Sequence, residues 1–258
     1  MSAPQRLAAL ALVESASLHG ALTTSAVSYA TEDGKVVWTN GPCADGIGSL
    51  QGSLDGGVSP TSGTFLPTGS HTYVVSFTNC VVHHLAGVQL NGVASAAYTT
   101  AEWSNLTATV SAVSVRGQGL AWRSELHDVT ADGSGSAVWT SVGSSRRTTT
   151  YTPAPGSRLV NNSTTNVATF GVGSHSRTHP PPPQGSSRFE DRFDNLKVAI
   201  NGTEYTLDGS LDTTTGSNGQ VTYTGEIRIT NNGTLMARIY GDARNALTIE
   251  VLVPLVPL

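Results

Sequence analysis

Tyr73-Val-Val-Ser-Phe77-Thr-Asn79-Cys80 carries the clearest structural signal in this chain, because its outline occurs twice. The second copy is Phe189-Glu-Asp-Arg-Phe193-Asp-Asn195-Leu196. Leu90-Asn91-Gly92 follows the first copy, and Leu207-Asp208-Gly209 follows the second. Aromatic residues four positions apart lie on one face of a strand. Each copy therefore predicts a strand with two inward aromatics, a turn, and a second strand closed by a glycine turn.

Composition favours an exported β protein. The chain has 258 residues, of which 38% are hydrophobic and only 12% are charged, whereas about 25% charged residues is usual. Ser, Thr, Gly and Asn fill the difference, and the only lysines are Lys35 and Lys197. Low charge fits a protein that adheres to itself or to a polymer. A net charge of −4 gives no basic face for nucleic acid, so no nucleic-acid partner is expected.

The two cysteines, Cys43 and Cys80, suggest one disulfide, since an even count in such a chain is typical of oxidising compartments. Closing a loop of that length would contribute roughly 3–4 kcal/mol. Their spacing is too long for a redox or zinc Cys-x-x-Cys motif. Two unrelated buried thiols are the alternative.

The N-terminal segment predicts the only helix. Apolar residues with helical spacing and a high alanine content predict ten to fifteen helical residues within residues 1–28, ending near Gly20. We expect this short N-terminal helix to lie against a sheet or to close the end of a barrel. No run approaches the ~18–20 apolar residues of a membrane helix, and residues 1–13 lack the strong apolar region and the cleavage site of a signal peptide. They read as the first helix of a mature chain whose export signal is not shown.

Alternating polarity predicts β structure from Tyr29 onward, with a hairpin turn at Glu32-Asp33-Gly34 and another at Asn201-Gly202. Glycine-rich turns are also expected at 117–119 and 132–135. The last strand carries Leu247, Ile249, Val251 and Val253, and the prolines after it would blunt a sheet edge. The pattern predicts an all-β fold: a large antiparallel meander, whether curled sheet, sandwich or barrel, of two similar halves at 29–142 and 188–258.

Residues 143–187 differ from both halves. Arg146-Arg147, several threonines, Pro153, Pro155 and the run Pro180–Pro183 predict a connection or a long exposed loop. One strand at Val167–Val172 is expected within it.

No catalytic or metal motif stands out, and no cofactor is expected. The chain has no Gly-x-Ser-x-Gly nucleophile elbow. His83 and His84 are adjacent, so they would point to opposite faces of a strand. His175 and His179 lie in the segment expected to be a loop, and no carboxylate follows them in sequence until Glu190-Asp191. Aspartates at 128–132 and 208–212 lack the alternation of a calcium loop, and turn chemistry explains them better.

Two acid–aromatic neighbours, Glu102 with Trp103 and Glu125 with Trp122, are of the kind found in sugar sites. Two such pairs are expected by chance in a chain of this length. They support only a minor hypothesis, an enzyme acting on polysaccharide, and the protein is predicted not to be an enzyme.

The sequence Phe77-Thr-Asn79-Cys80 … Leu90-Asn91-Gly92, preceded by Gly41-Pro-Cys43-Ala-Asp-Gly46, resembles a diffuse group of exported proteobacterial proteins and lipoproteins of unknown function. The resemblance covers residues 36–100 and, more faintly, 189–253. It implies export to the periplasm, outer surface or medium, a Cys43–Cys80 disulfide and an all-β fold. The second half departs from it, since Leu196 stands where the first half has a cysteine. The group offers no catalytic residue to transfer.

Two functions remain open from the sequence. The first is a secreted or cell-surface structural or adhesive protein that assembles with itself or another surface protein, with the last strand as a pairing edge. The alternative is a periplasmic carrier that holds a lipid or another apolar small molecule inside a curled sheet. In the carrier, the inward aromatics would line the site: Tyr73, Phe77, Phe189, Phe193 and Tyr223.

Overall fold

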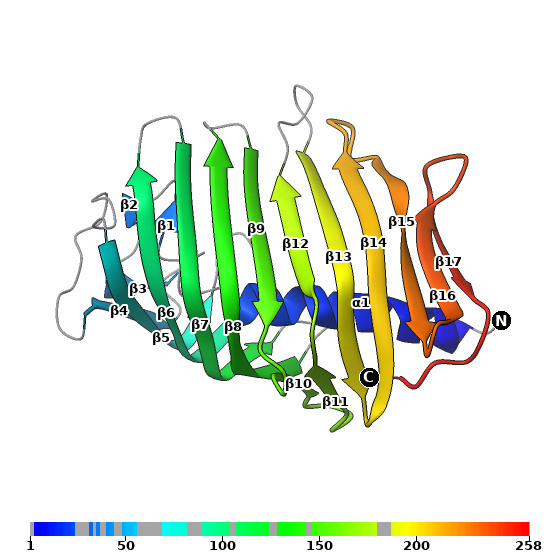
Figure 1. The fold of residues 1–258 in the computed structure, drawn as a ribbon, viewed down its shortest axis with the longest axis horizontal. Helices are drawn as coiled ribbons and strands as arrows, with labels where there is room; N and C mark the ends of the chain where they lie inside the picture. The colour runs from blue at the N-terminus through cyan, green and yellow to red at the C-terminus, as the bar shows by residue number, and fades with distance from the viewer. Residues whose placement is uncertain are drawn as a thin grey trace.

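The computed structural model describes residues 3–23, 31–32, 35–36, 40–43, 48–55, 69–81, 89–103, 107–123, 128–142, 146–179 and 187–257. In this part of the chain, fifteen strands form one curled antiparallel sheet, and a helix lies along its concave side (Figure 1). The all-β prediction is confirmed, and of the forms left open the curled sheet is the one observed.

The elements are α1 (Ala3–Thr23), β1 (Thr31–Glu32), β2 (Lys35–Val36), β3 (Asn40–Pro42), β4 (Ser49–Leu54), β5 (Gly69–Val81), β6 (Gln89–Trp103), β7 (Thr107–Arg123), β8 (Asp128–Val142), β9 (Arg146–Pro153), β10 (Arg158–Asn161), β11 (Val167–Phe170), β12 (Ser174–His179), β13 (Ser187–Ile200), β14 (Thr203–Thr215), β15 (Val221–Asn231), β16 (Thr234–Gly241) and β17 (Leu247–Val251).

Most neighbours in sequence are neighbours in the sheet, so the predicted meander is present. It departs from a simple meander between β8 and β13. One part of β8 pairs with β10, which pairs through β11 to the end of β13, while the other part reaches the start of β13 through β9 and β12. The hairpin predicted at Glu32-Asp33-Gly34 is represented by β1 and β2, which pair with each other.

The predicted connection at 143–187 is wrong for most of its length, because residues 146–179 form four strands of the sheet, β9 to β12. Two of the prolines on which the predicted connection was based lie at or next to strand ends. Pro153 is the last residue of β9, and Pro155 lies in the turn before β10, two places that proline tolerates. The threonines of β9, which precede Pro153, are good strand formers. Pro180–Pro183 lie outside the described residues.

The helix is longer than predicted, because Gly20 does not end it. The 21 residues of α1 continue to Thr23. Gly20 is buried, and a β-carbon built on it would lie 3.2 Å from Cδ1 of Tyr151 on the sheet. The glycine is therefore a close-packing position between helix and sheet, which a helix can contain at a cost of about 1 kcal/mol.

The repeated sequence forms a β-bulge in each half of the sheet. In β5 the register shifts just after Phe77, and Asn79 has a φ of 46°. In β13 the register shifts just after Phe193, and Asn195 has a φ of 47°. Asparagine is one of the few residues that enter this left-handed region readily. The asparagine shared by both copies is thus the residue that bends each strand.

The Leu-Asn/Asp-Gly part of each copy lies inside the neighbouring strand, so the predicted glycine turns are wrong. Asn91 Oδ1 accepts a hydrogen bond from the bulged backbone N–H of the first copy at 2.7 Å, and Asp208 Oδ1 accepts the equivalent bond at 3.4 Å. Gly92 and Gly209 lie directly opposite the second aromatic of their copies, with φ values of 105° and 109°. An aromatic ring opposite a strand glycine is a known way to fill the space that the missing side chain leaves.

A third copy joins β7 to β8, and the sequence pattern had not identified it. Gly117-Gln118-Gly119-Leu120 takes the place of the aromatic and asparagine, and Ala131-Asp132-Gly133 supplies the second part. The register shifts between Gly117 and Leu120, and Gly119 donates its N–H to Asp132 Oδ1 at 2.7 Å. The turns predicted at 117–119 and 132–135 are therefore wrong, since both segments lie inside long strands.

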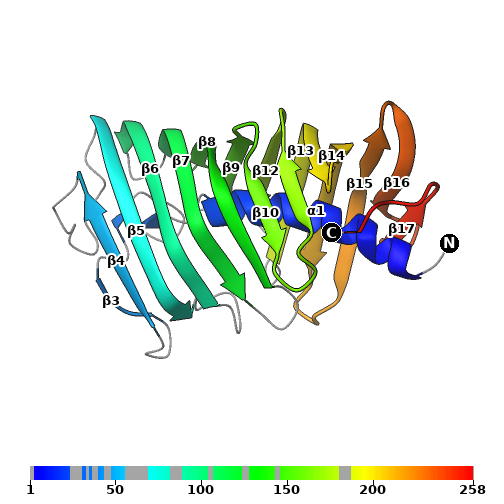
Figure 2. The ribbon, with the colours of Figure 1, turned by 90° about the horizontal axis from the view of Figure 1, so that it is seen from below.

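These irregular positions follow one another across the sheet and form a line that we call the seam. The strands β5, β6, β7, β8, β13 and β14 contribute one residue with positive φ each, and so do the turns between β9 and β10 and between β11 and β12. The seam residues are Asn79, Gly92, Gly119, Gly133, Gly156, Gly173, Asn195 and Gly209. Bulges and glycines with positive φ increase local bending, and the sheet folds into a trough along this line (Figures 1 and 2).

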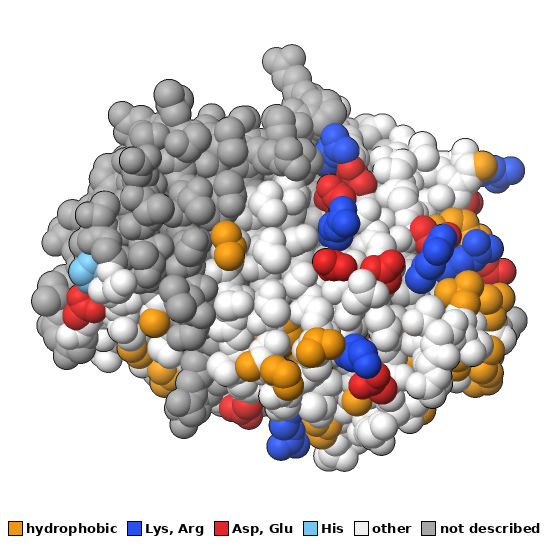
Figure 3. Space-filling model, viewed as in Figure 1, with side chains coloured by type: hydrophobic (Ala, Val, Ile, Leu, Met, Phe, Trp, Pro, Cys, Tyr) orange, Lys and Arg blue, Asp and Glu red, His pale blue; other side chains and the backbone are white. Residues whose placement is uncertain are grey.

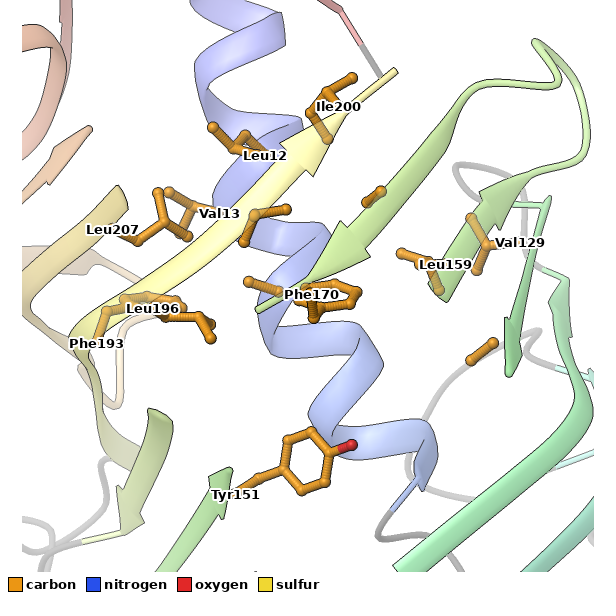
Figure 4. Close-up of a cluster of buried hydrophobic side chains, with 14 of the residues drawn as sticks. Leu12, Val13, Val129, Tyr151, Leu159, Phe170, Phe193, Leu196, Ile200 and Leu207 are labelled. Atoms are coloured by element: carbon orange, nitrogen blue, oxygen red, sulfur yellow. The ribbon is translucent and has the colours of Figure 1, made fainter. Parts of the chain in front are cut away.

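Helix α1 fills the trough across the strands. It contacts β7, β8, β9, β10 and β12, and at its N-terminal end β16 and β17. Its inner side chains, such as Leu12 and Val13, pack against Phe170, Leu196 and Ile200 from the sheet (Figure 4). The core of the described molecule is thus the interface between an apolar helix and the bent sheet.

Candidate functional site

A polar cluster lies on the concave face of the sheet beside α1. His175 and Arg177 stand on β12, opposite Phe193 and Asp191 of β13. Asp191 Oδ1 is 2.8 Å from His175 Nε2 and 2.9 Å from Arg177 Nε, and its Oδ2 is 2.8 Å from Arg177 Nη2. The expectation that these histidines occupy a loop without a nearby carboxylate is wrong, because pairing of the two strands brings a carboxylate against His175.

The cluster is well shielded from water on one side. The side chains of His175 and Asp191 are 7% and 15% exposed, whereas that of Arg177 is 40% exposed. Burial alone would raise the pKa of Asp191, but hydrogen bonds from His175 and Arg177, together with their charges, outweigh it and lower the pKa to about 2. Asp191 is therefore an anion throughout the physiological range.

Ser17 of α1 completes a serine, histidine and aspartate grouping, with Ser17 Oγ 3.5 Å from His175 Nε2. A nucleophilic triad needs the serine on one ring nitrogen and the carboxylate on the other. Here both approach Nε2. Because ionised Asp191 can only accept, Nε2 must carry the hydrogen and cannot take a proton from Ser17. The grouping joins helix to sheet and does not have the geometry of a serine hydrolase relay.

His19 is a buried polar residue on the side of α1 that faces the sheet. It is fully buried, its ring stacks on Phe170 with centroids 4.2 Å apart, and Tyr151 lies 5.7 Å away. Burial lowers its pKa from 6.5 to about 4, against a smaller raising effect of the backbone and charge of Asp132. His19 is thus neutral near pH 7, and protonation would place a charge in the core.

The predicted inward aromatics divide into two groups. Phe77 and Phe193 are buried in the hydrophobic core, whereas Phe189 and Tyr223 are half-buried on the part of β13 and β15 farther from the seam. Arg177 covers the ring of Phe189 at 4.9 Å. Tyr73 lies on β5, where its backbone is paired with Leu54 of β4, and its side chain lies outside what is described. These residues do not form one continuous described surface.

The candidate metal and sugar residues are not brought together. Asp128 and Asp132 accept hydrogen bonds from Asn162 and from the bulge, while Asp208 serves its own bulge and Asp212 pairs with Arg188. Within the described ranges, no three histidine, cysteine or acidic residues are grouped as metal ligands would be. His83, His84 and Glu125 lie outside these ranges, as do the side chains of Glu102, Trp103 and Trp122.

The two ends of the sheet are the strands β3 and β17, each with a neighbour on one side only among the described residues. Cys43, just after β3, forms a disulfide with Cys80 of β5. The predicted disulfide is therefore present. It ties the end strand to the second strand inward, across β4, and thereby fixes the β3 end of the sheet.

At the other end, alternate backbone groups of β17 point outward. Asp242 N donates to Ala246 O, and Leu252 N donates to Met236 O, so positions 248 and 250 also face β16. The backbone N–H and C=O groups of Leu247, Ile249 and Val251 consequently point away from β16. Three of the four predicted edge residues thus lie on an end strand, while Val253 lies beyond it and is exposed.

The convex face carries paired charges of both signs over β13 to β17 (Figure 3). Arg188 pairs with Asp212, and Arg238 bridges Glu226 and Glu250. Such solvent-exposed ion pairs contribute little to the stability of the fold. Their alternating signs leave no single-sign field that would attract a polyanion.

No family model matches this chain, and no curated protein or solved structure is significantly similar to it. The described part also contains no helix that is both long and apolar enough to cross a membrane. Sequence reasoning missed Arg177 and Asp191 as cluster residues. For Asp191 the available signal was its inward parity with Phe189 and Phe193, two predicted inward positions on the same strand.

Proposed function

We propose that this protein is an exported structural or adhesive subunit that associates with other chains through the ends of its sheet. The observation that supports it most is the outward direction of the backbone groups of Leu247, Ile249 and Val251 on β17. An end strand with unpaired N–H and C=O groups is a template for another strand.

The edge strand β17 is only partly protected against pairing with strands of other chains. β17 spans five residues, and Pro254 follows it, both of which limit edge pairing. However, its side chains at the outward-facing backbone positions are apolar, without the inward lysine that often protects a free edge. Such an edge suits pairing with a chosen partner over a short length.

Export is supported by the disulfide between Cys43 and Cys80, because disulfides persist in oxidising compartments. The low content of charged residues and the Thr- and Ser-rich strands agree with a secreted surface protein. The carrier alternative has less support, because α1 occupies the trough on which an apolar ligand would rest.

The test compares Ile249→Pro with Ile249→Ala. Both substitutions remove the isoleucine side chain, but only proline removes the outward N–H. Wild type and Ile249→Ala are expected to form filaments or ordered arrays at high concentration, seen by light scattering and negative-stain microscopy, while Ile249→Pro stays as discrete particles. Discrete particles for wild type, or equal assembly of the two variants, would show that β17 is not an assembly edge.

A further inference from the structure

The end strand β3 offers few hydrogen bonds to another chain. Cys43 N donates to Gly48 O, so the next position that faces β4 is Gly41, and Asn40 and Pro42 direct their backbone groups outward. Proline has no N–H. Among the three residues of β3, only Asn40 therefore has a backbone N–H that points outward.

The opposite end strand, β17, offers a fuller set. Leu247, Ile249 and Val251 each direct an N–H and a C=O outward. Their side chains lie on the concave side of the sheet, whereas Thr248 and Glu250 lie on the convex side. A strand of another chain thus finds three consecutive hydrogen-bonding positions here.

The residues that follow β17 turn away from this edge. Leu252 still donates its N–H to Met236 O and is 47% exposed. Leu255 N then donates to Gln5 Oε1 of α1 at 2.7 Å, and the end of the chain runs back beneath the sheet (Figures 1 and 2). The exposed apolar side chain of Leu252 therefore lies where the line of the edge strand ends.

The spacing of the outward positions selects one way in which two copies of β17 can pair. If Ile249 lies opposite Ile249 of a second antiparallel copy, Leu247 lies opposite Val251 in both directions, and each of these three pairs exchanges two hydrogen bonds. A register centred on Thr248 or on Glu250 keeps only two such pairs within the strand. The second of these registers also places two glutamates directly opposite each other, which is destabilising.

We infer that β17 pairs antiparallel with β17 of a second copy of this chain, on a two-fold axis through Ile249. The inference rests on the edge pairing proposed above and names its partner. The contact places Glu250 opposite Thr248 of the second copy, while the carboxylate keeps its ion pair with β16. Leu252 would lie beside Ala246 of the second copy and would lose part of its exposure to water.

This pair is the first step of assembly and not its end. A two-fold contact closes after two copies, and the β3 strands then form the two ends of the combined sheet. Because β3 offers fewer hydrogen bonds, joining at β3 is weaker and needs a higher concentration. Filaments would consequently grow from pairs, with two copies as the repeating unit.

The first experiment is mild oxidation of the full chain carrying Ile249→Cys, followed by a non-reducing gel. Cys43 and Cys80 are joined to each other, so the new thiol is the only free one in the chain. In the inferred pair the two α-carbons at 249 lie about 5.5 Å apart, a distance that a disulfide spans. We expect a covalent dimer. Leu247→Cys is the matched control and should stay monomeric, because its two copies would lie roughly 13 Å apart along the strands.

The second experiment changes the charge opposite Glu250 and does not depend on disulfide geometry. Thr248→Lys places a positive charge opposite Glu250 of the second copy twice in each pair, whereas Thr248→Glu places a negative one there. Sedimentation equilibrium below the concentration of filament formation should show a Kd about tenfold lower for Thr248→Lys than for Thr248→Glu. Pairing of β17 with β3 predicts no such difference, because β3 has no charged residue.

Circular dichroism checks that each variant is folded. Equal cross-linking of Ile249→Cys and Leu247→Cys, absence of a covalent dimer in Ile249→Cys, or equal Kd values for the two Thr248 variants would each overturn the two-fold pair. If Ile249→Pro still abolished assembly in such a case, the proposed edge pairing would stand with another partner segment. If Ile249→Pro had no effect on assembly, both proposals would fail.

Discussion

Replacing Asp191 by asparagine tests the cluster that joins β12, β13 and α1. The substitution keeps the size of the side chain but removes the carboxylate that receives Arg177 through two bonds and His175 through a third. The Arg177 charge then loses its partner, and the orientation of His175 under the helix loses its anchor. We expect the folded state to lose stability without losing its secondary structure.

The magnitude follows from the pKa of Asp191, which folding lowers from 3.8 to about 2. Each unit corresponds to 1.36 kcal/mol, so the ionised carboxylate contributes about 2 kcal/mol at pH 7. Removing one member of a buried ion pair costs roughly 3–5 kcal/mol. Because the side chain of Arg177 is 40% exposed and water can reach it, the smaller value is the better expectation.

The pH dependence of stability distinguishes the charge of Asp191 from other effects of the substitution. A carboxyl with a lowered pKa stabilises the fold fully above its unfolded pKa, and this contribution disappears as the pH falls through about 2. Urea unfolding followed by circular dichroism should therefore show a difference of about 2 kcal/mol between wild type and Asp191→Asn at pH 7, closing as the pH falls below about 4. Asp194→Asn is the matched control, since Asp194 is exposed on the opposite face of the same strand and should change stability by less than about 0.5 kcal/mol.

Equal stability of wild type and Asp191→Asn at pH 7 would refute the reasoning. So would a loss that is the same at pH 7 and pH 2, because that loss would come from altered packing and not from the charge. If Asp194→Asn lost as much stability as Asp191→Asn, the loss would not depend on the position of the carboxylate on the inner face of β13.

Three further changes probe the helix, the disulfide and the seam. His19, whose folded pKa is about 4 against 6.5 in the unfolded chain, stabilises the fold above pH 6.5 and loses about 3 kcal/mol as the pH falls through 4. His19→Phe should abolish that part of the pH dependence in urea titrations, and an unchanged profile would contradict it. Reducing Cys43–Cys80, whose sequence separation is 37, should cost about 4 kcal/mol in the chain-entropy model, and unchanged thermal unfolding in dithiothreitol would oppose this. Gly209→Ala should destabilise by at least about 2 kcal/mol more than Gly202→Ala. Both have positive φ, but only the new β-carbon at 209 meets a backbone oxygen, at 2.2 Å, and equal effects would contradict the argument.

Alternation of apolar residues predicted the strands of the second half well, because each strand has one solvent-exposed face and one buried face. β14, β15 and β16 turn Leu207, Ile229 and Ala237 toward the core as their spacing requires. The twofold occurrence of Phe-x-Asn also marked a real structural unit. Its meaning was misjudged, since a residue with positive φ inside a strand and one in a turn have the same local sequence preferences.

The polar cluster and the seam could not be predicted in the same way. His175 meets Asp191 only because β12 pairs with β13 in one register, and the proline-rich connection between them hid that pairing. Gly20 and Pro153 are helix and strand breakers by propensity, and tertiary packing overrides propensity at such positions. The third copy of the bulge has glycines where the others have an aromatic and an asparagine, so only the structure reveals its equivalence.

The position of the seam explains why the sheet keeps two ends. A barrel closes when a sheet curves across its strands, whereas here each strand bends along its own length, at Asn79 in β5 and at Asn195 in β13. Bending of this kind makes a trough, and it leaves β3 and β17 at opposite ends of the strand order. Each hairpin that carries a bulge supplies its own part of the bend. The seam ends at β14, three strands before β17, so a strand that pairs with β17 would not strain the bent strands.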